Sequence, residues 1–221
     1  MLIRFRQIVK FTFIIFVSIL MLIGGLNSLP NLVRVDRVVA APLTEGVKPG
    51  LPEQSAAVLV ESISAGFNHS CGLQSNGTLS CWGDNEYGQS MPPDGTFTQV
   101  SAGAYHSCGL QSNGTLSCWG NNEFSQSTPP FGTFTQVSAG WRHTCGLQSD
   151  GTLTCWGLND EGQATSPAGI FTQVSAGLEH SCGLKSDGTL ACWGYNLLGQ
   201  SSPPGGSFTQ VSAGGYNSCG L

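Results

Sequence analysis

The chain has 221 residues, of which 31 are glycine, 40% are apolar and only 10% are charged. This composition supplies enough apolar side chains for a folded core, and it excludes a disordered, highly charged polypeptide. The formal net charge is −5, but from Val58 onward two basic residues stand against ten acidic ones, which gives that part a charge of −8. Because an acidic surface repels phosphate backbones, the sequence predicts no nucleic-acid partner.

Residues 1–28 have the pattern of a targeting segment. Arg4, Arg6 and Lys10 precede an uncharged apolar run at residues 11–26. Such a run is long for the core of a signal peptide and shorter than the roughly 20 residues of a transmembrane helix. Two alternatives therefore stay open: a cleaved signal peptide, or an N-terminal anchor that attaches the chain to the membrane. Both predict an exported chain, either secreted or held on the outer face of the cell membrane.

Residues 29–57 form a predicted linker, since they contain four prolines and no hydrophobic periodicity. Residues 58–221 follow as a repeat domain. A Ser-Ala-Gly triplet marks each unit and recurs every 37 residues, starting at Ser64, Ser101, Ser138, Ser175 and Ser212. Each unit contains three short runs with the alternation of β-strands and none with helical spacing. A strict period of this size predicts an all-β propeller, here with four complete units and the start of a fifth.

A hairpin with two cysteines stands at the centre of each unit. In the first unit, Ser75-Asn76-Gly77 suits a three-residue turn, and this turn places Cys71 opposite Cys81. Directly opposed residues have Cα atoms roughly 4.5 to 5.5 Å apart, within the range that disulfides span. A Cys-x9-Cys spacing is also unlike that of structural zinc sites. We therefore predict four disulfides: Cys71 with Cys81, Cys108 with Cys118, Cys145 with Cys155, and Cys182 with Cys192.

Cys219 begins the fifth copy of the hairpin, and the ten-residue offset places its expected partner beyond Leu221. We therefore expect the chain to be a fragment of a larger repeat protein, or a chain that closes its ring with another chain.

Two other residue types recur in every hairpin and are predicted to be structural. The histidines could suggest a metal ring, but no carboxylate accompanies them at a fixed spacing, and Asn217 replaces the histidine in the fifth copy. We predict that they form hydrogen bonds and that the protein holds no metal or other cofactor. The tryptophans offer a large apolar surface and one N–H donor, so we expect each to seal its sheet against the next one. These residues are His69, His106, His143 and His180, and Trp82, Trp119, Trp156 and Trp193.

Candidate binding residues lie where the units differ. Two segments vary: two residues after Ser-Ala-Gly, and the loop after Trp-Gly. Aromatic and charged residues dominate both segments, as they do in binding hot spots. The alternative, that these are ordinary drifting loop positions, stays open. The candidates are Phe67, Asn68, Tyr105, Trp141, Arg142 and Glu179 in the first segment, and Tyr87, Phe124 and Tyr195 in the second.

The sequence predicts that the protein is not an enzyme. Each His-Ser pair belongs to the repeated motif, so none stands out as a nucleophile with its base. Acidic residues do not pair at fixed spacings, and no glycine-rich phosphate-binding motif occurs.

The repeated motifs Gly-x-x-His-Ser/Thr-Cys-x-Leu, Ser-Asn/Asp-Gly-Thr-Leu and Cys-Trp-Gly-x-Asn resemble the regulator of chromosome condensation repeat, in its short, cysteine-containing exported bacterial form. The resemblance implies a propeller, which in that family has seven blades. The chain is also similar to the secreted β-lactamase-inhibitor propellers, which bind a protein target through variable blade loops. The leader and the acidic repeats argue against the founding member's nuclear role. We therefore expect an exported, disulfide-braced module that binds a protein or cell-surface ligand, or alternatively an anchored structural or adhesive surface module.

Overall fold

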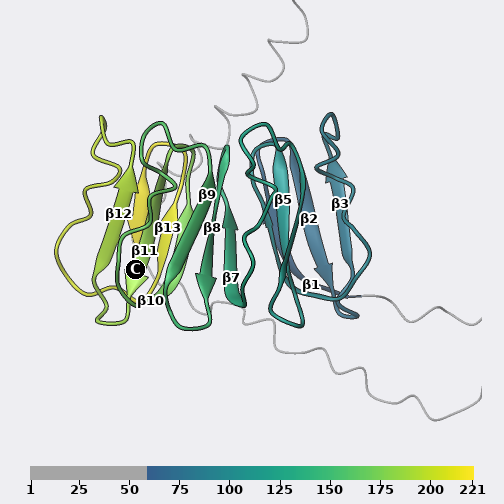
Figure 1. Ribbon diagram of the computed structural model, residues 1–221, viewed down its shortest axis with the longest axis horizontal. Coiled ribbons are helices and arrows are strands. Elements are labelled where there is room, and N and C mark those ends of the chain that lie inside the picture. The colour runs from purple at the N-terminus through teal and green to yellow at the C-terminus, as the bar shows by residue number, and fades with distance from the viewer. Residues whose placement is uncertain (1–58) are drawn as a thin grey trace, which may run out of the picture. The chain divides into compact units, whose positions relative to one another are not determined.

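The computed structural model describes residues 59–221, and these residues fold as a row of small antiparallel sheets (Figure 1). The predicted leader and the whole of the predicted linker lie outside the described residues. No helix between residues 59 and 221 is long and apolar enough to cross a membrane.

Each repeat forms one sheet, in which three consecutive strands pair in chain order. The fifth unit has two strands within the described residues. The strands are β1 (Val60–Ala65), β2 (His69–Gln74) and β3 (Leu79–Gly83); β4 (Phe97–Ala102), β5 (His106–Gln111) and β6 (Leu116–Gly120); β7 (Phe134–Ala139), β8 (His143–Gln148) and β9 (Leu153–Gly157); β10 (Phe171–Ala176), β11 (His180–Lys185) and β12 (Leu190–Gly194); and β13 (Val211–Ala213) and β14 (Ser218–Gly220). The described residues do not form a closed ring, but the predicted all-β repeat architecture is confirmed.

The hairpin has the register that the turn predicts. Cys71 lies opposite Cys81, and Leu73 lies opposite Leu79. Gly77 adopts a left-handed conformation with φ of 81°, which a residue without Cβ adopts at little cost. The side chain of Asn76 accepts hydrogen bonds from the amide and the hydroxyl of Thr78. The turn therefore fixes which residues share a face.

All four disulfides predicted from the spacing are present: Cys71–Cys81, Cys108–Cys118, Cys145–Cys155 and Cys182–Cys192. In each pair the Cα atoms lie 4.0 Å apart, slightly closer than we expected. Cys219 is free and exposed. We call the first, second and third strands of each sheet the inner, middle and outer strands. Each bridge joins the middle and outer strands of its own sheet, so it braces one repeat rather than linking two.

The core lies between neighbouring sheets. Between the first two repeats, Cys71 and Leu73 of β2 pack against Phe97 and Val100 of β4, with Trp119 of β6 at the edge. The same arrangement recurs at the next contacts. Both faces of an internal sheet are thus apolar and covered, and a single repeat could not bury either face alone.

The tryptophans contact the preceding sheet, so our expectation that they seal the following one is wrong in direction. The Nε1 atom of Trp119 donates a hydrogen bond to the carbonyl oxygen of Gln89 in the previous repeat, over 2.9 Å. Alternation along the strand explains the direction, because the cysteine face is the one turned to the following repeat. Trp82 has no preceding sheet within residues 59–221 and is 51% exposed.

Candidate functional site

Strand direction brings both variable segments of a repeat to one end of its sheet. β1 ends where the first segment, Phe67 and Asn68, begins, and β3 ends beside it at Gly83. The amide of Asp84 donates to the carbonyl of Asn68 over 2.9 Å. The next three repeats form the same bond, from Asn121 to Tyr105, from Leu158 to Arg142, and from Tyr195 to Glu179. We call this end of the array, which contains both segments of every repeat, the variable end.

Backbone hydrogen bonds also connect the first variable segment of one repeat to the next repeat. The amide of Phe67 donates to the carbonyl of Gly103 over 3.2 Å, and the amide of Ala104 donates to that of Gly140 over 3.1 Å. A Cβ atom at Gly103 would lie 2.4 Å from the carbonyl oxygen of Gly140. The repeated glycine of Ser-Ala-Gly therefore permits a close approach that holds neighbouring variable segments together.

Aromatic residues from the first two repeats meet at the variable end. The ring of Tyr105 lies 5.8 Å from that of Tyr87 in an edge-to-face arrangement and 6.5 Å from that of Phe67. Phe67 is 68% exposed and Tyr87 is 45% exposed. Such arrangements are favourable for aromatic pairs. The second segment of one repeat therefore packs against the first segment of the next, which the spacing within a repeat did not predict.

Arg142 forms the equivalent contact between the second and third repeats. Its guanidinium carbon lies 4.4 Å from the centre of the Trp141 ring and 5.3 Å from that of Phe124. Both distances are within the range of cation–π interactions. Among residues 59–221 its guanidinium has no carboxylate partner within salt-bridge distance and no hydrogen bond. The side chain is half-buried, so the aromatic rings hold a positive charge whose N–H groups are free.

The variable end also contains an apolar hollow of about 310 Å³, where β1, β4, β7, β10 and β13 end. Its floor consists of the Ala-Gly backbone of the five units, and its larger side chains are Phe67, Trp141 and Leu178. Leu178 is absent from our sequence-based candidates. Its position in the sequence could have identified it, because it directly follows Ser-Ala-Gly, as Phe67 and Trp141 do.

The remaining predicted candidates share this end without joining the aromatic clusters. Asn68 is exposed, and Glu179 and Tyr195 are half-buried; backbone hydrogen bonds place all three in the variable segments. Six carboxylates also belong to these segments, against the single cation Arg142. They are Asp84, Glu86, Glu123, Asp160, Glu161 and Glu179.

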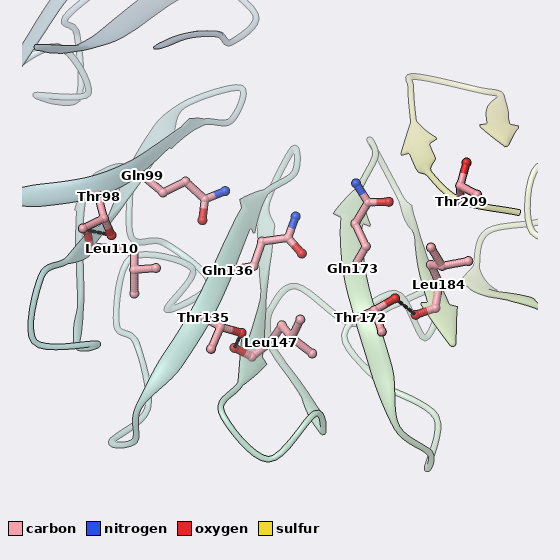
Figure 2. Close-up of a pocket in the computed structure, with 10 residues that line it drawn as sticks. All are labelled: Thr98, Gln99, Leu110, Thr135, Gln136, Leu147, Thr172, Gln173, Leu184 and Thr209. Carbon is pink, nitrogen blue, oxygen red and sulfur yellow. Dashed lines mark hydrogen bonds between the residues drawn. The ribbon is translucent and has the colours of Figure 1, made fainter. Parts of the chain in front are cut away.

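A second hollow, of about 760 Å³, lies along the inner strands toward the opposite end (Figure 2). Figure 2 shows Gln99, Gln136 and Gln173 side by side on successive inner strands. Gln99 accepts a hydrogen bond from the amide of Val137 and donates one to its carbonyl. These side chains therefore join inner strands that share no backbone ladder. Sequence reasoning missed them, although glutamine recurs in every Phe-Thr-Gln-Val run.

The four histidines lie between repeats and are buried. Nε2 of His106 lies 2.8 Å from Oγ1 of Thr144, and this hydroxyl donates to the carbonyl of Gln126 over 3.0 Å. Because the hydroxyl has one proton, Nε2 of His106 must donate, and its Nδ1 atom is unprotonated. This Nδ1 is buried without a hydrogen-bond partner, as it is in His69, His143 and His180.

Burial, and then the charges of neighbouring histidines, lower the pKa of His106 to about 3; burial and His180 do the same for His143. The hydroxyls that receive these bonds are also buried: Ser107, Thr144 and Ser181 are each 0% exposed. No group of three potential metal ligands occurs among the described residues. The geometry therefore fits a chain of hydrogen bonds that joins repeats.

Comparison with known proteins agrees with this architecture. The profile of the "Regulator of chromosome condensation (RCC1) repeat" matches residues 60–89, 97–126, 134–163 and 171–200, which together are more than half of the chain. The chain therefore belongs to the RCC1 repeat family. No curated protein matches its sequence.

Solved structures with this fold include two plant receptor ectodomains. The entire ectodomain of the Physcomitrella patens receptor kinase CR4 is 33% identical, with a TM-score of 0.64, over 79% of this chain and 50% of that one. The CRINKLY WD40 ectodomain of Arabidopsis thaliana ACR4 is 28% identical, with a TM-score of 0.63, over 79% of this chain and 65% of that one. The chain thus spans half to about two thirds of these structures.

A third structure, Prp20p from Saccharomyces cerevisiae, is described with its binding properties to Gsp1p and histones. It is 18% identical to this chain, with a TM-score of 0.66, over 77% of this chain and 57% of Prp20p. At this identity the likeness shows the fold alone.

Proposed function

We propose that this chain is an exported binding module that recognises a protein or cell-surface ligand through its variable end. The observation that carries the proposal is the packing of Tyr87 against Tyr105 and of Phe124 against Arg142. The members of each pair come from different repeats, and Tyr87, Phe124 and Arg142 each differ from the residue at the equivalent position of every other repeat. Fixed aromatic groups with an arginine are typical of interface hot spots. The repeated residues hold the scaffold, and the variable residues form the contact.

Three observations support export. The four disulfides fit an oxidising compartment, where such bonds persist. Residues 1–28 have the charge and apolar pattern of a targeting segment. Two similar structures are receptor ectodomains.

The proposal includes no catalytic step, and binding is the whole of the activity that we assign. The His69–Ser107 and His106–Thr144 pairs are buried between repeats, and their hydroxyls donate to backbone carbonyls. The acidic repeat half also disfavours nucleic acid as the ligand.

The test compares two pairs of substitutions in the full, oxidised chain. Tyr87→Ala with Phe124→Ala removes two aromatic groups from the variable end, and Thr98→Ala with Thr135→Ala alters the opposite hollow. We expect binding to the exported proteins and outer surface of the cells that produce the chain to weaken at least tenfold with the first pair, because each hot-spot truncation costs about 1 to 2 kcal/mol or more. The second pair should leave binding within twofold. Equal binding of both variants would remove the proposal.

The alternative function is an anchored structural or adhesive surface module. The observation in its favour is the apolar run at residues 11–26, which is longer than most signal-peptide cores. Mass spectrometry of the cell-associated protein separates the two functions, because an anchored module retains residues 1–28 and a secreted module lacks them.

A further inference from the structure

Arg142 is held ready for an anionic group. Trp141 and Phe124 contact its guanidinium at 4.4 and 5.3 Å from the ring centres. These contacts restrict the side chain before a partner binds, so less conformational freedom is lost on binding. The N–H groups of a guanidinium point outward in its plane, and a carboxylate matches them with two parallel hydrogen bonds. The arrangement therefore favours a carboxylate over a neutral acceptor.

The charges around Arg142 restrict what else the partner carries. Lys185, the other basic residue after Val58, ends β11 at the opposite end from the variable segments. Glu123, Glu161 and Glu179 belong to the variable segments on either side of Arg142. A uniformly acidic partner would meet these carboxylates as well as the arginine, and it would be repelled. A partner with lysine and arginine side chains around a single carboxylate would instead be attracted to Glu123, Glu161 and Glu179 of this chain.

The apolar hollow lies directly beside this cation. Trp141 contacts Arg142 and also lines the hollow, together with Phe67 and Leu178. A partner whose carboxylate reaches Arg142 therefore places its neighbouring side chain at the hollow. An apolar side chain there removes apolar surface from water on both sides.

We infer that the partner presents a peptide segment in which one carboxylate stands next to an apolar side chain, on a surface that is otherwise basic. This inference rests on the proposed function and specifies its partner. The carboxylate binds the N–H groups of Arg142, the apolar side chain enters the hollow beside Trp141, and basic residues face the surrounding carboxylates.

The experiment uses a phage-displayed library of random 12-residue peptides, selected on the full, oxidised chain. Selected peptides should contain one Asp or Glu beside an apolar residue, together with Lys or Arg. In a synthetic copy of a selected peptide, replacing that acid by its amide should weaken binding about tenfold on the unaltered chain. The same replacement should change binding less than twofold on the Arg142→Met variant, which keeps the length of the side chain but lacks the charge. Lys185→Met is the matched control and should behave like the unaltered chain.

The outcomes separate the two proposals. Peptides that bind, and lose binding with Tyr87→Ala and Phe124→Ala, but show no preference for a carboxylate, would overturn this inference and leave the proposed function intact. An equal loss from the amide replacement on the unaltered chain and on Arg142→Met would also overturn it. If no peptide depends on Tyr87 or Phe124, the proposed function and this inference fail together.

Discussion

The Nε2 atom of His106 lies 2.8 Å from the Oγ1 atom of Thr144, one repeat further along the chain. The Thr144 hydroxyl in turn donates a hydrogen bond to the carbonyl of Gln126. This carbonyl also accepts a hydrogen bond from Nε1 of Trp156. The recurring threonine and tryptophan thus share one carbonyl between repeats, and the histidine reaches it through the threonine hydroxyl. Because the histidine must donate through Nε2, a second proton on its buried Nδ1 would find no acceptor.

Acid should therefore destabilise the fold. Burial lowers the pKa of His106 and His143 to about 3, against about 6.5 in an unfolded chain. The unfolded state binds more protons between these values, so the stabilisation is complete above pH 6.5 and is lost as the pH falls toward 3. By pH 5 the free energy of unfolding should drop by about 2 kcal/mol for each histidine, measured as a lower urea midpoint.

The control for this prediction is His106→Asn, which introduces the residue that the fifth repeat has at Asn217. This variant should show a smaller decrease between pH 7 and pH 5, because it has one fewer titrating group. Hydrogen bonds from the Thr152 and Thr189 hydroxyls lower the pKa of Asp150 and Asp187, so these carboxylates titrate below this range. A urea midpoint that is equal at pH 7 and pH 5 would contradict the account.

The ring of Phe97, at the start of inner strand β4, lies against Gly109 of middle strand β5. A Cβ atom at Gly109 would lie 2.5 Å from the Phe97 ring, whereas one at Gly72 would lie 3.5 Å from Val60, the residue that replaces phenylalanine in the first repeat. Gly109→Ala should therefore lower the free energy of unfolding by about 1 to 3 kcal/mol through overpacking. Gly72→Ala should stay within about 0.5 kcal/mol. Chemical denaturation measures both, and an equal effect at the two sites would argue against this packing.

The tryptophans provide another matched pair. Trp119 donates to the carbonyl of Gln89 and packs on the preceding sheet, while Trp82 is 51% exposed. Trp119→Phe should lower the free energy of unfolding by about 1 to 3 kcal/mol, because it leaves a carbonyl with one bond fewer and opens space in the core. Trp82→Phe should have little effect. If thermal unfolding shows that Trp82→Phe is the more damaging change, the assigned direction of packing is wrong.

Gln200 offers a stabilising substitution. In the second repeat the Nε2 of Gln126 donates to Asn121 over 2.6 Å, but in the fourth repeat Tyr195 occupies that position, and the Nε2 of Gln200 is buried without a partner. Tyr195→Asn supplies the missing acceptor and should raise the free energy of unfolding by about 1 kcal/mol. Calorimetry of the two chains checks this, and a lower melting temperature for the variant would contradict it.

Local chemistry predicted much of the fold. The Ser-Asn-Gly turn fixed the register, and the register placed Cys71 opposite Cys81, because one residue of slippage would move every side chain to the other face. The contacts between repeats were harder to predict. The pairing of Tyr87 with Tyr105 depends on how one sheet lies against the next, and no spacing within a repeat encodes this. The prediction of which neighbouring sheet Trp119 packs against was wrong for the same reason.

The bridging role of Gln99 illustrates a signal that was present but unused. Glutamine recurs at the same place in three inner strands, β4, β7 and β10, and its side chain joins strands that have no backbone ladder between them. A polar residue that repeats at a half-buried strand position indicates a hydrogen-bonding role. The candidates at the variable end lacked any such regularity, so sequence alone could name them but could not bring them together.

The most direct test of the central claim is a hydroxyl-radical footprint of the full chain with and without its bound ligand. We predict that Tyr87, Tyr105, Phe124 and Trp141 lose reactivity when the ligand binds, while exposed residues at the opposite end keep theirs. Protection of the exposed Phe131 and Ile170, which precede β7 and β10 at the opposite end, with unchanged reactivity at these four aromatic residues, would contradict the claim that the variable end is the binding surface.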